Sequence, residues 1–419
     1  AVVFAGALDF SGPLQTAGRA VFGDEWRLPQ VRSIGGAALV LTLTLYPYVY
    51  MLARVAFESA GARVLEAAQS LGLSRREAFR RALLPMARPA IAAGSGLVAM
   101  ETLADFGVVA AFNVDTFTTS IYRAWFGMFS LAAALQMAAL LALLALVAAA
   151  IERRLRGDRG FASQRSSGAV PQRVMLGGAA GLGATAAASF VLAVAFVLPL
   201  VQLLAWAWQH AAMDVDARYL GFVLRSLGLA ASGSIVVVTA AIALGYAMRG
   251  DRRAWVQSLG RFASVGYALP GTVLAVGLFA PIAAMNGWLQ DWLDVRWGEA
   301  APQLALQGTL FTMLLAYLAQ FLAVGVGPVE SGLARIHRNL DEVAVSLGVR
   351  GVARLGRVHL PLLRGSVLAA AVLVFVDLMK ELPITLMTRP FGFETLAVRV
   401  FEMAAEGEWT RAAVPSVFI

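Results

Sequence analysis

Apolar residues fill runs of about twenty positions along most of this chain, long enough for helices that cross a hydrocarbon core of about 30 Å. Short polar segments separate these runs. A membrane β-barrel would show alternating segments of about ten residues instead. Examples of the runs are 35–55, 131–151, 186–208, 262–284 and 309–326. The pattern predicts an all-α polytopic membrane protein.

Composition agrees with this prediction. Residues of the AVILMFWYC group make up 59% of the 419 residues and charged residues only 14%, whereas about a quarter of a soluble domain is charged. The formal charge of +8 comes almost wholly from arginine, and Lys380 is the one lysine. Because the arginines lie between apolar runs, we expect them to orient helices rather than bind nucleic acid. The chain has no cysteine, which excludes disulfides and thiol chemistry.

Loop charges alternate along the chain. Segments 152–173 and 249–261 carry net charges of +4 and +3, whereas 209–218 and 286–302 carry −1 and −2. By the positive-inside rule the basic loops face the cytoplasm and the acidic loops face the outside. We therefore expect a multi-pass membrane protein whose loops lie alternately on the two sides of the membrane.

Two basic segments of the chain are copies of each other. One reads EAAQSLGLSRREAFRRALLPMAR from Glu66, and the other reads EVAVSLGVRGVARLGRVHLPLLR from Glu342. They align without a gap at an offset of 276, which continues to Arg123 and Arg399. We interpret the chain as a tandem duplication, a common construction in transporters.

The duplication predicts the domain organisation: a first repeat at 1–160, a cytoplasmic linker at 161–174 and a second repeat at 175–419. Spans near 186–208 and 221–248 have no first-half counterparts, and 131–151 lacks a complete second-half one. We therefore expect about six spans per half in a longer protein, with both ends of this chain truncated. The alternative is a ragged duplication with real ends.

Each repeated segment reads as a short helix, a glycine break and a second helix that ends at Leu-Pro. Gly72 and Gly348 suit a turn with a left-handed backbone. Pro85 and Pro361 mark where the next span begins. A short cytoplasmic helix present twice indicates a docking element for a two-fold partner. A pair of membrane-surface loops without a partner is the alternative.

The spacing of these segments resembles the cytoplasmic loop signature of binding-protein-dependent ABC transporter permeases: E-A-A, three residues, G, nine residues, an apolar residue, x-L-P. The second copy departs from it with Val343 in place of the first alanine. The resemblance implies a type I importer-like fold in each half and a location in the bacterial inner (cytoplasmic) membrane. It also implies loops that couple to an ATPase through Glu66, Ala67, Ala68, Gly72 and Pro85, and through Glu342, Ala344, Gly348 and Pro361.

The resemblance implies partners as well. A cytoplasmic ATP-binding subunit, expected as a dimer, would use ATP and Mg, and a periplasmic binding protein would deliver the substrate. This chain carries no Walker A sequence, because that motif needs a lysine after glycines and Lys380 has none before it. We therefore expect no enzyme activity and no bound cofactor in this chain, whose other contacts are with membrane lipid.

Further segments are similar to the ferric-iron branch of these permeases: METLADFG at 100–107, TFTTSIYRAWF at 116–126 and VDLMKELP at 376–383. The segment YALPG at 267–271 is also similar to a stretch in these permeases, but the polyamine, thiamine and sulfate branches have related sequences. The resemblance implies ferric iron as the substrate, with a polyamine, thiamine or sulfate permease as the alternative.

Carboxylates occur inside two apolar runs, 90–112 and 366–387. The offset pairs Glu101 with Asp377 and Asp105 with Glu381, so each half stacks two acids on one helix face. An acid at that depth costs about 2.5–3.5 kcal/mol. We hypothesise that these acids and Lys380 line a cation path; no metal site is assigned.

Two other interpretations of the acids stay open. They could cap helix ends or hold spans together, which is a structural role. In a secondary transporter driven by an ion gradient, Glu101 and Asp377 would instead carry protons or ions. The second interpretation leaves the two matched cytoplasmic loops unexplained, and a membrane scaffold or sensor would leave the acids unexplained.

Overall fold

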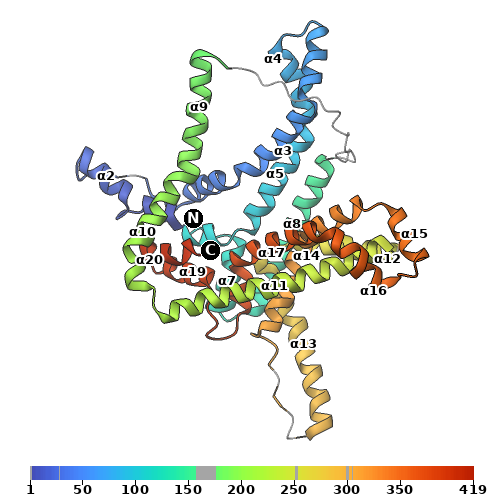
Figure 1. Cartoon of the computed structure of the whole chain (residues 1–419). Helices are drawn as coiled ribbons and strands as arrows, with labels where there is room; N and C mark the ends of the chain where they lie inside the picture. The colour runs from blue at the N-terminus through green and yellow to red at the C-terminus, as the bar shows by residue number, and fades with distance from the viewer. Residues whose placement is uncertain (1, 28, 157–175, 251–252, 299–301, 304) are drawn as a thin grey trace. The chain divides into compact units, whose positions relative to one another are not determined.

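The computed structural model describes residues 2–27, 29–156, 176–250, 253–298, 302–303 and 305–419 (Figure 1). These residues form helices and connecting turns, and no strand occurs among them. The predicted all-α class is confirmed. Among the described residues, eight helical stretches are long and apolar enough to cross a membrane: Ile34–Glu58, Arg75–Ala104, Leu131–Arg154, Gly178–Asp214, Arg218–Gly250, Gly271–Trp297, Leu310–Arg335 and Gly351–Met379.

The chain divides into two compact units. The first comprises Ala1–Val114 and Leu143–Ala205, and the second comprises Asp115–Ala142 and Trp206–Ile419. These units differ from the predicted repeats, because 115–142 clusters with the second unit. The predicted linker 161–174 lies outside the described residues, so the predicted domain boundaries stay a prediction.

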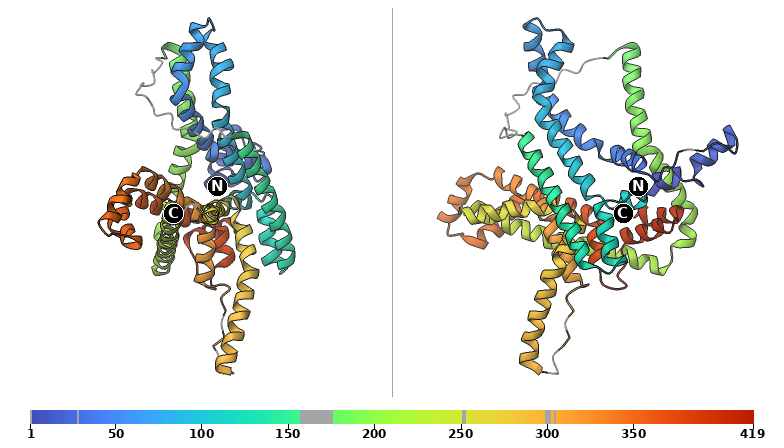
Figure 2. Two further views of the ribbon diagram at one scale, coloured as in Figure 1. Left: turned by 90° about the vertical axis from the view of Figure 1, so that its right-hand side faces the viewer. Right: turned by 180° about the vertical axis from the view of Figure 1, so that it is seen from behind.

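The first unit is built on a pair of long helices, α3 (Ile34–Ser70) and α5 (Leu84–Ala104), which pack along each other. Figure 2 shows the connection between them at one tip of the pair. A side chain at Gly94 of α5 would come within 2.8 Å of the Val49 Cα atom, so this close approach requires glycine. The other helices with residues in this unit are α1 (Val2–Leu8), α2 (Pro13–Phe22), α4 (Arg75–Ala78), η1 (Phe79–Leu83), α6 (Gly107–Ala111), α8 (Leu131–Arg156), α9 (Gly178–Leu192), η3 (Ala193–Val197) and α10 (Leu198–Asp214).

The second unit is built on three long helices that pack on one another: α11 (Ala217–Gly250), α14 (Leu310–Arg335) and α17 (Leu360–Met379). Val237, Tyr317 and Val374 are fully buried between them. The Tyr317 hydroxyl also lies 2.5 Å from the Thr385 hydroxyl. The other helices of this unit are α7 (Phe117–Tyr122), η2 (Arg123–Gly127), α12 (Ala254–Ala268), α13 (Gly271–Trp297), α15 (Arg338–Ser346), α16 (Gly351–Arg354), η5 (Leu355–His359), α18 (Pro383–Thr388), α19 (Leu396–Ala405) and α20 (Trp409–Val417).

Three apolar runs that predict continuous spans are broken in the structure. Run 90–112 breaks between α5 and α6, and run 366–387 breaks between α17 and α18 at the matching position. Run 262–284 breaks between α12 and α13. Pro270 and Pro383 stand at the starts of α13 and α18, where the missing N–H of proline leaves no intrahelical bond unmade. Hydropathy alone does not reveal such breaks.

Candidate functional site

The two predicted coupling loops have the same backbone geometry. Gly72 and Gly348 follow the ends of α3 and α15 with φ values of 86° and 80°. This left-handed region carries no steric penalty for glycine. In each loop, the residue after the glycine donates its N–H to the alanine carbonyl four residues before the glycine: Leu73 to Ala68 at 3.1 Å and Val349 to Ala344 at 2.8 Å. The repeat seen in the letters therefore extends to the hydrogen bonds that close each turn.

The predicted loop residues divide between a buried and an exposed face. Ala68 and Ala344 are buried, which explains the need for a small residue at that position. The acidic residues Glu66 and Glu342 are exposed, as is Ala67. The loops thus pack through the alanine and leave the glutamate side facing outward.

A leucine at the tip of each loop was not among the site residues predicted from the sequence. Leu71 is 83% exposed and Leu347 is 75% exposed, and each directly precedes the turning glycine. The Ser-Leu-Gly triplet shared by both copies was the available signal. The observation that stands out is the repetition, because both turns expose the same side chain at the same position.

The helix after each loop contains a π turn beside the expected proline. The turns are η1 (Phe79–Leu83) and η5 (Leu355–His359), again separated by 276 positions. The prediction that a helix ends at Leu-Pro is wrong, because the backbone continues through Pro85 and Pro361 into α5 and α17. The wider turn accommodates the missing proline N–H. Such turns are rare and are frequent at functional sites.

Two of the predicted membrane acids cap short helices. Asp105 Oδ1 accepts hydrogen bonds from the backbone N–H groups of Val108 and Val109 at 3.0 and 3.1 Å, at the start of α6. Glu381 Oε1 accepts from the N–H of Ile384 at 2.7 Å, at the start of α18. The two caps lie at the same positions of the repeat. This geometry agrees with the interpretation in which these two acids cap helix ends.

The other pair of acids lies one helical turn earlier. Glu101 on α5 and Asp377 on α17 are both half-buried. The Lys380 ammonium lies 2.9 Å from Asp377 Oδ1, so this lysine partly neutralises the Asp377 carboxylate. Glu101 and Asp105 belong to the first unit and the other three residues to the second. In the part of the chain that the structure describes, no group of three or more histidine, aspartate or glutamate side chains is placed to hold a metal.

Residues 26–157 and 237–402 match the family of binding-protein-dependent transport system inner membrane components. The matched ranges contain both loops and both carboxylate pairs. The chain belongs to this family. The predicted resemblance to these permeases and the predicted inner-membrane location are confirmed.

Individual permeases show how the likeness is distributed. The chain is 24% identical over 390 residues to the Fe(3+)-transport system permease protein FbpB 2 of Haemophilus influenzae, which covers 91% of this chain and 73% of that protein. A Salmonella typhimurium protein named for 2-aminoethylphosphonate transport, PhnV, is 30% identical over 161 residues, or 38% of this chain and 55% of that protein. The sulfate transport system permease protein CysT of Salmonella typhimurium is 36% identical over 74 residues, or 18% of this chain and 27% of that protein.

The second loop of this permease is tied to its own unit by a polar cluster. Asp341 on α15 accepts a hydrogen bond from Arg249 Nη2 at 2.7 Å, and its other oxygen lies 2.7 Å from Nε2 of the fully buried His359. Arg249 also donates to the carbonyl oxygens of Leu333 and Ile336, at 2.5 and 3.0 Å. One guanidinium therefore holds both the end of α14 and the coupling helix.

This cluster keeps Asp341 ionised. Desolvation raises the pKa of Asp341, but the hydrogen bonds and charge of Arg249, with His359, outweigh it and hold that pKa below its usual range. The contribution of these Asp341 contacts to the free energy of unfolding is therefore present at neutral pH. It is lost only as the pH falls through the lowered pKa of Asp341.

The first loop has no counterpart of this cluster. The offset places Leu65 at the position of Asp341 and Leu83 at that of His359. Accordingly α3 runs unbroken from Ile34 to Ser70, whereas α15 is a separate helix after a break at Ile336 and His337. Sequence reasoning missed the cluster because its members lie 18 and 92 residues apart. An aspartate and a histidine where the first copy has leucines were the only signal.

Proposed function

We propose that this chain is the permease subunit of an ATP-driven importer that receives its substrate from a periplasmic binding protein. The observation that carries the proposal is the pair of loops with the same glycine conformation, the same closing hydrogen bond, the same π turn and an exposed leucine. A partner ATPase, which would bind ATP and Mg, would contact both loops. Two such loops on one chain suit a dimeric ATPase.

We propose ferric iron as the substrate. A relative that is matched over 91% of this chain is named for Fe(3+) transport. Carboxylate oxygens inside the membrane also suit a hard cation better than an oxyanion. The relatives named for 2-aminoethylphosphonate and sulfate match shorter stretches and make an oxyanion the second candidate. Polyamine and thiamine are further alternatives.

Uptake in proteoliposomes tests both proposals. The full-length permease, its ATPase and its binding protein would be reconstituted, and uptake of radiolabelled ferric iron measured with and without ATP and vanadate. We expect ATP-dependent, vanadate-sensitive uptake. It should be lost in Gly72→Val and Gly348→Val, because a β-branched residue in the left-handed region costs about 1–2 kcal/mol or more. Gly228→Val is the control, because Gly228 lies in open space with an ordinary helical backbone.

The outcomes separate the alternatives. ATP-dependent uptake of sulfate, a phosphonate, a polyamine or thiamine in place of iron would leave the importer and remove the iron assignment. Uptake that ignores vanadate and collapses with an ionophore would contradict the importer itself and favour an ion-gradient transporter.

We propose that Glu101 and Asp377 line the translocation path, whereas Asp105 and Glu381 hold the backbone beside it. Glu101→Gln together with Asp377→Asn should reduce ferric uptake at least tenfold, because intramembrane acids that face a path are functional. The measurement is the initial rate of iron uptake at saturating binding protein. Full uptake by this double variant would remove both residues from the path.

A further inference from the structure

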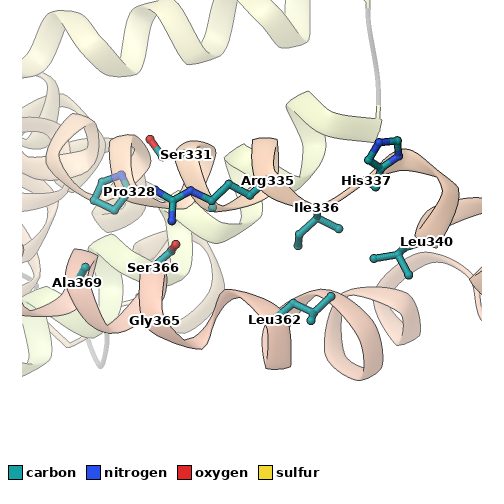
Figure 3. Close-up of a pocket in the computed structure, with 11 residues that line it drawn as sticks. Pro328, Ser331, Arg335, Ile336, His337, Leu340, Leu362, Gly365, Ser366 and Ala369 are labelled. Atoms are coloured by element: carbon teal, nitrogen blue, oxygen red, sulfur yellow. The ribbon is translucent and has the colours of Figure 1, made fainter. Parts of the chain in front are cut away.

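A cleft of about 700 Å³ lies within the second unit, between α14, the start of α15 and α17. Its polar groups come from Arg335, His337, Ser331 and Ser366. Figure 3 shows the Arg335 side chain extending along α14 toward the two serines. Among the described residues that line the cleft, none is acidic. A guanidinium beside hydroxyl groups favours an anion, and phosphate suits its planar set of donors.

The guanidinium of Arg335 is also uncommitted. It makes no hydrogen bond or ion pair with the described residues. By comparison, Arg249 in the same unit is saturated by carbonyl oxygens and by Asp341. Arg335 can therefore bind a ligand without breaking an existing contact.

The remaining walls of the cleft are apolar and partly open. Leu340 on α15 is 43% exposed and Leu362 on α17 is 57% exposed, and Ile336 and Pro328 also line the cleft. The volume falls within the range of about 300–1,000 Å³ that is typical of small-molecule sites. One end of the cleft therefore suits an anionic group, and its walls suit hydrocarbon.

The cleft lies where two spans reach the membrane boundary. Arg335 is the last residue of the span Leu310–Arg335, and Leu362 is the third residue of α17. Lipid headgroups occupy this level of a bilayer. Basic pockets between spans on the cytoplasmic side bind anionic headgroups.

We propose that this cleft binds an anionic phospholipid of the cytoplasmic leaflet, with its phosphate on Arg335 and its glycerol and upper acyl chain along Leu340 and Leu362. The lipid would brace the break between α14 and α15, because Ile336 and His337 form both that break and part of the cleft. The cytoplasmic location of the cleft follows from the loop charges. The proposal therefore does not depend on which substrate the protein carries.

The first repeat lacks the same chemistry. The offset of 276 places Val55, Ser59, Gly61 and Ala90 at the positions of Ser331, Arg335, His337 and Ser366. The arginine and both cleft serines are therefore specific to the second repeat. We expect one specific lipid per chain.

Native mass spectrometry of the full-length permease, titrated in detergent with phosphatidylglycerol or phosphatidylcholine, tests the proposal. We expect one phosphatidylglycerol to bind in preference to phosphatidylcholine. Arg335→Gln should weaken that binding about fivefold, the loss of one arginine contact at a membrane surface. Phosphatidylcholine binding should not change.

A second variant tests the cleft without touching the arginine. Gly365 lines the cleft, and a side chain there meets nothing within 4 Å, so Gly365→Leu should fill the space and weaken phosphatidylglycerol binding without strain. Gly228→Leu, in open space on α11, should bind like the parent.

Three results would overturn the proposal. The first is phosphatidylglycerol binding that neither Arg335→Gln nor Gly365→Leu weakens. The second is inorganic phosphate competing at the same concentration as the lipid, which would make the ligand soluble. The third is a cysteine at Leu362 that cross-links to the ATPase in the assembled complex, which would make the cleft a protein interface.

Discussion

Asp105 and Glu381 each accept backbone N–H groups at the start of a short helix. An unpaired N–H in a bilayer costs several kcal/mol, so a helix that begins inside the membrane needs an acceptor there. A carboxylate supplies that acceptor and also adds negative charge to the positive end of the helix. Capping by these two residues requires an oxygen acceptor and does not by itself require a negative charge.

Two substitutions at Asp105 separate these roles. Asparagine caps helices about as well as aspartate, whereas alanine at a cap costs about 1 kcal/mol. We expect Asp105→Asn to keep the free energy of unfolding measured by denaturant titration in detergent micelles, and Asp105→Ala to lower it by about that amount. Equal losses in both variants would show that the charge stabilises the fold. Glu381→Gln and Glu381→Ala provide the same comparison in the second half.

Single residues differed in how far the sequence revealed them. The offset of 276 identified the paired acids and the paired glycines, because these residues align directly in the sequences of the two repeats. Their structural roles were less accessible. Gly72 was predictable, since a turn after a helix favours glycine, but the hydrogen bonds of Asp105 depend on a break that hydropathy does not show. The exposure of Leu71 depends on the turn itself.

The coupling helices differ in their support. The second, α15, is held by Asp341, Arg249 and His359, and the first is the continuous end of α3. A separate helix of nine residues gains little from its own hydrogen bonds and depends on tertiary contacts. The first coupling helix is thus supported as part of a longer helix, and the second by side-chain contacts with its own unit.

Removing one charge from this clamp should destabilise the second unit. Asp341→Asn leaves Arg249 and His359 with weaker partners, and we expect a loss of about 2 kcal/mol, as for hydrogen bonds to a charged group. The matched control is Glu58→Gln, which breaks the exposed Arg54–Glu58 pair of the first unit, with side chains 52% and 49% exposed. A surface pair of this kind contributes less than about 1 kcal/mol. Thermal unfolding in detergent compares the two, and equal shifts would contradict the clamp.

The sequence predicted which stretches are long and apolar enough to span a membrane better than it predicted the π turns and breaks within them. All eight spanning stretches overlap apolar runs of the sequence, because burial in lipid requires such runs. The π turns η1 and η5 were not predicted, since one additional residue in a turn leaves little trace in an apolar pattern. The separate short helix that was predicted before each glycine is present in the second copy, as α15. In the first copy that prediction is wrong, because the same positions form the continuous end of α3.

At the scale of the whole molecule, one chain carries two loops that repeat each other down to their hydrogen bonds. A protein family model covers both halves, and the named relatives are permeases of transport systems. The central claim is that both loops contact a separate ATPase. The absence of cysteine from the chain makes single-cysteine variants simple to interpret.

Cysteine cross-linking to the ATPase in the reconstituted complex tests this claim most directly. Leu71→Cys and Leu347→Cys place a thiol at the exposed tip of each loop. The control is Val295→Cys, because Val295 is 90% exposed and lies in the acidic segment 286–302, which is expected on the outer side of the membrane. We predict that both loop variants form a cross-link to the ATPase subunit and that Val295→Cys forms none. A complex that assembles and hydrolyses ATP while neither loop variant cross-links would contradict the account.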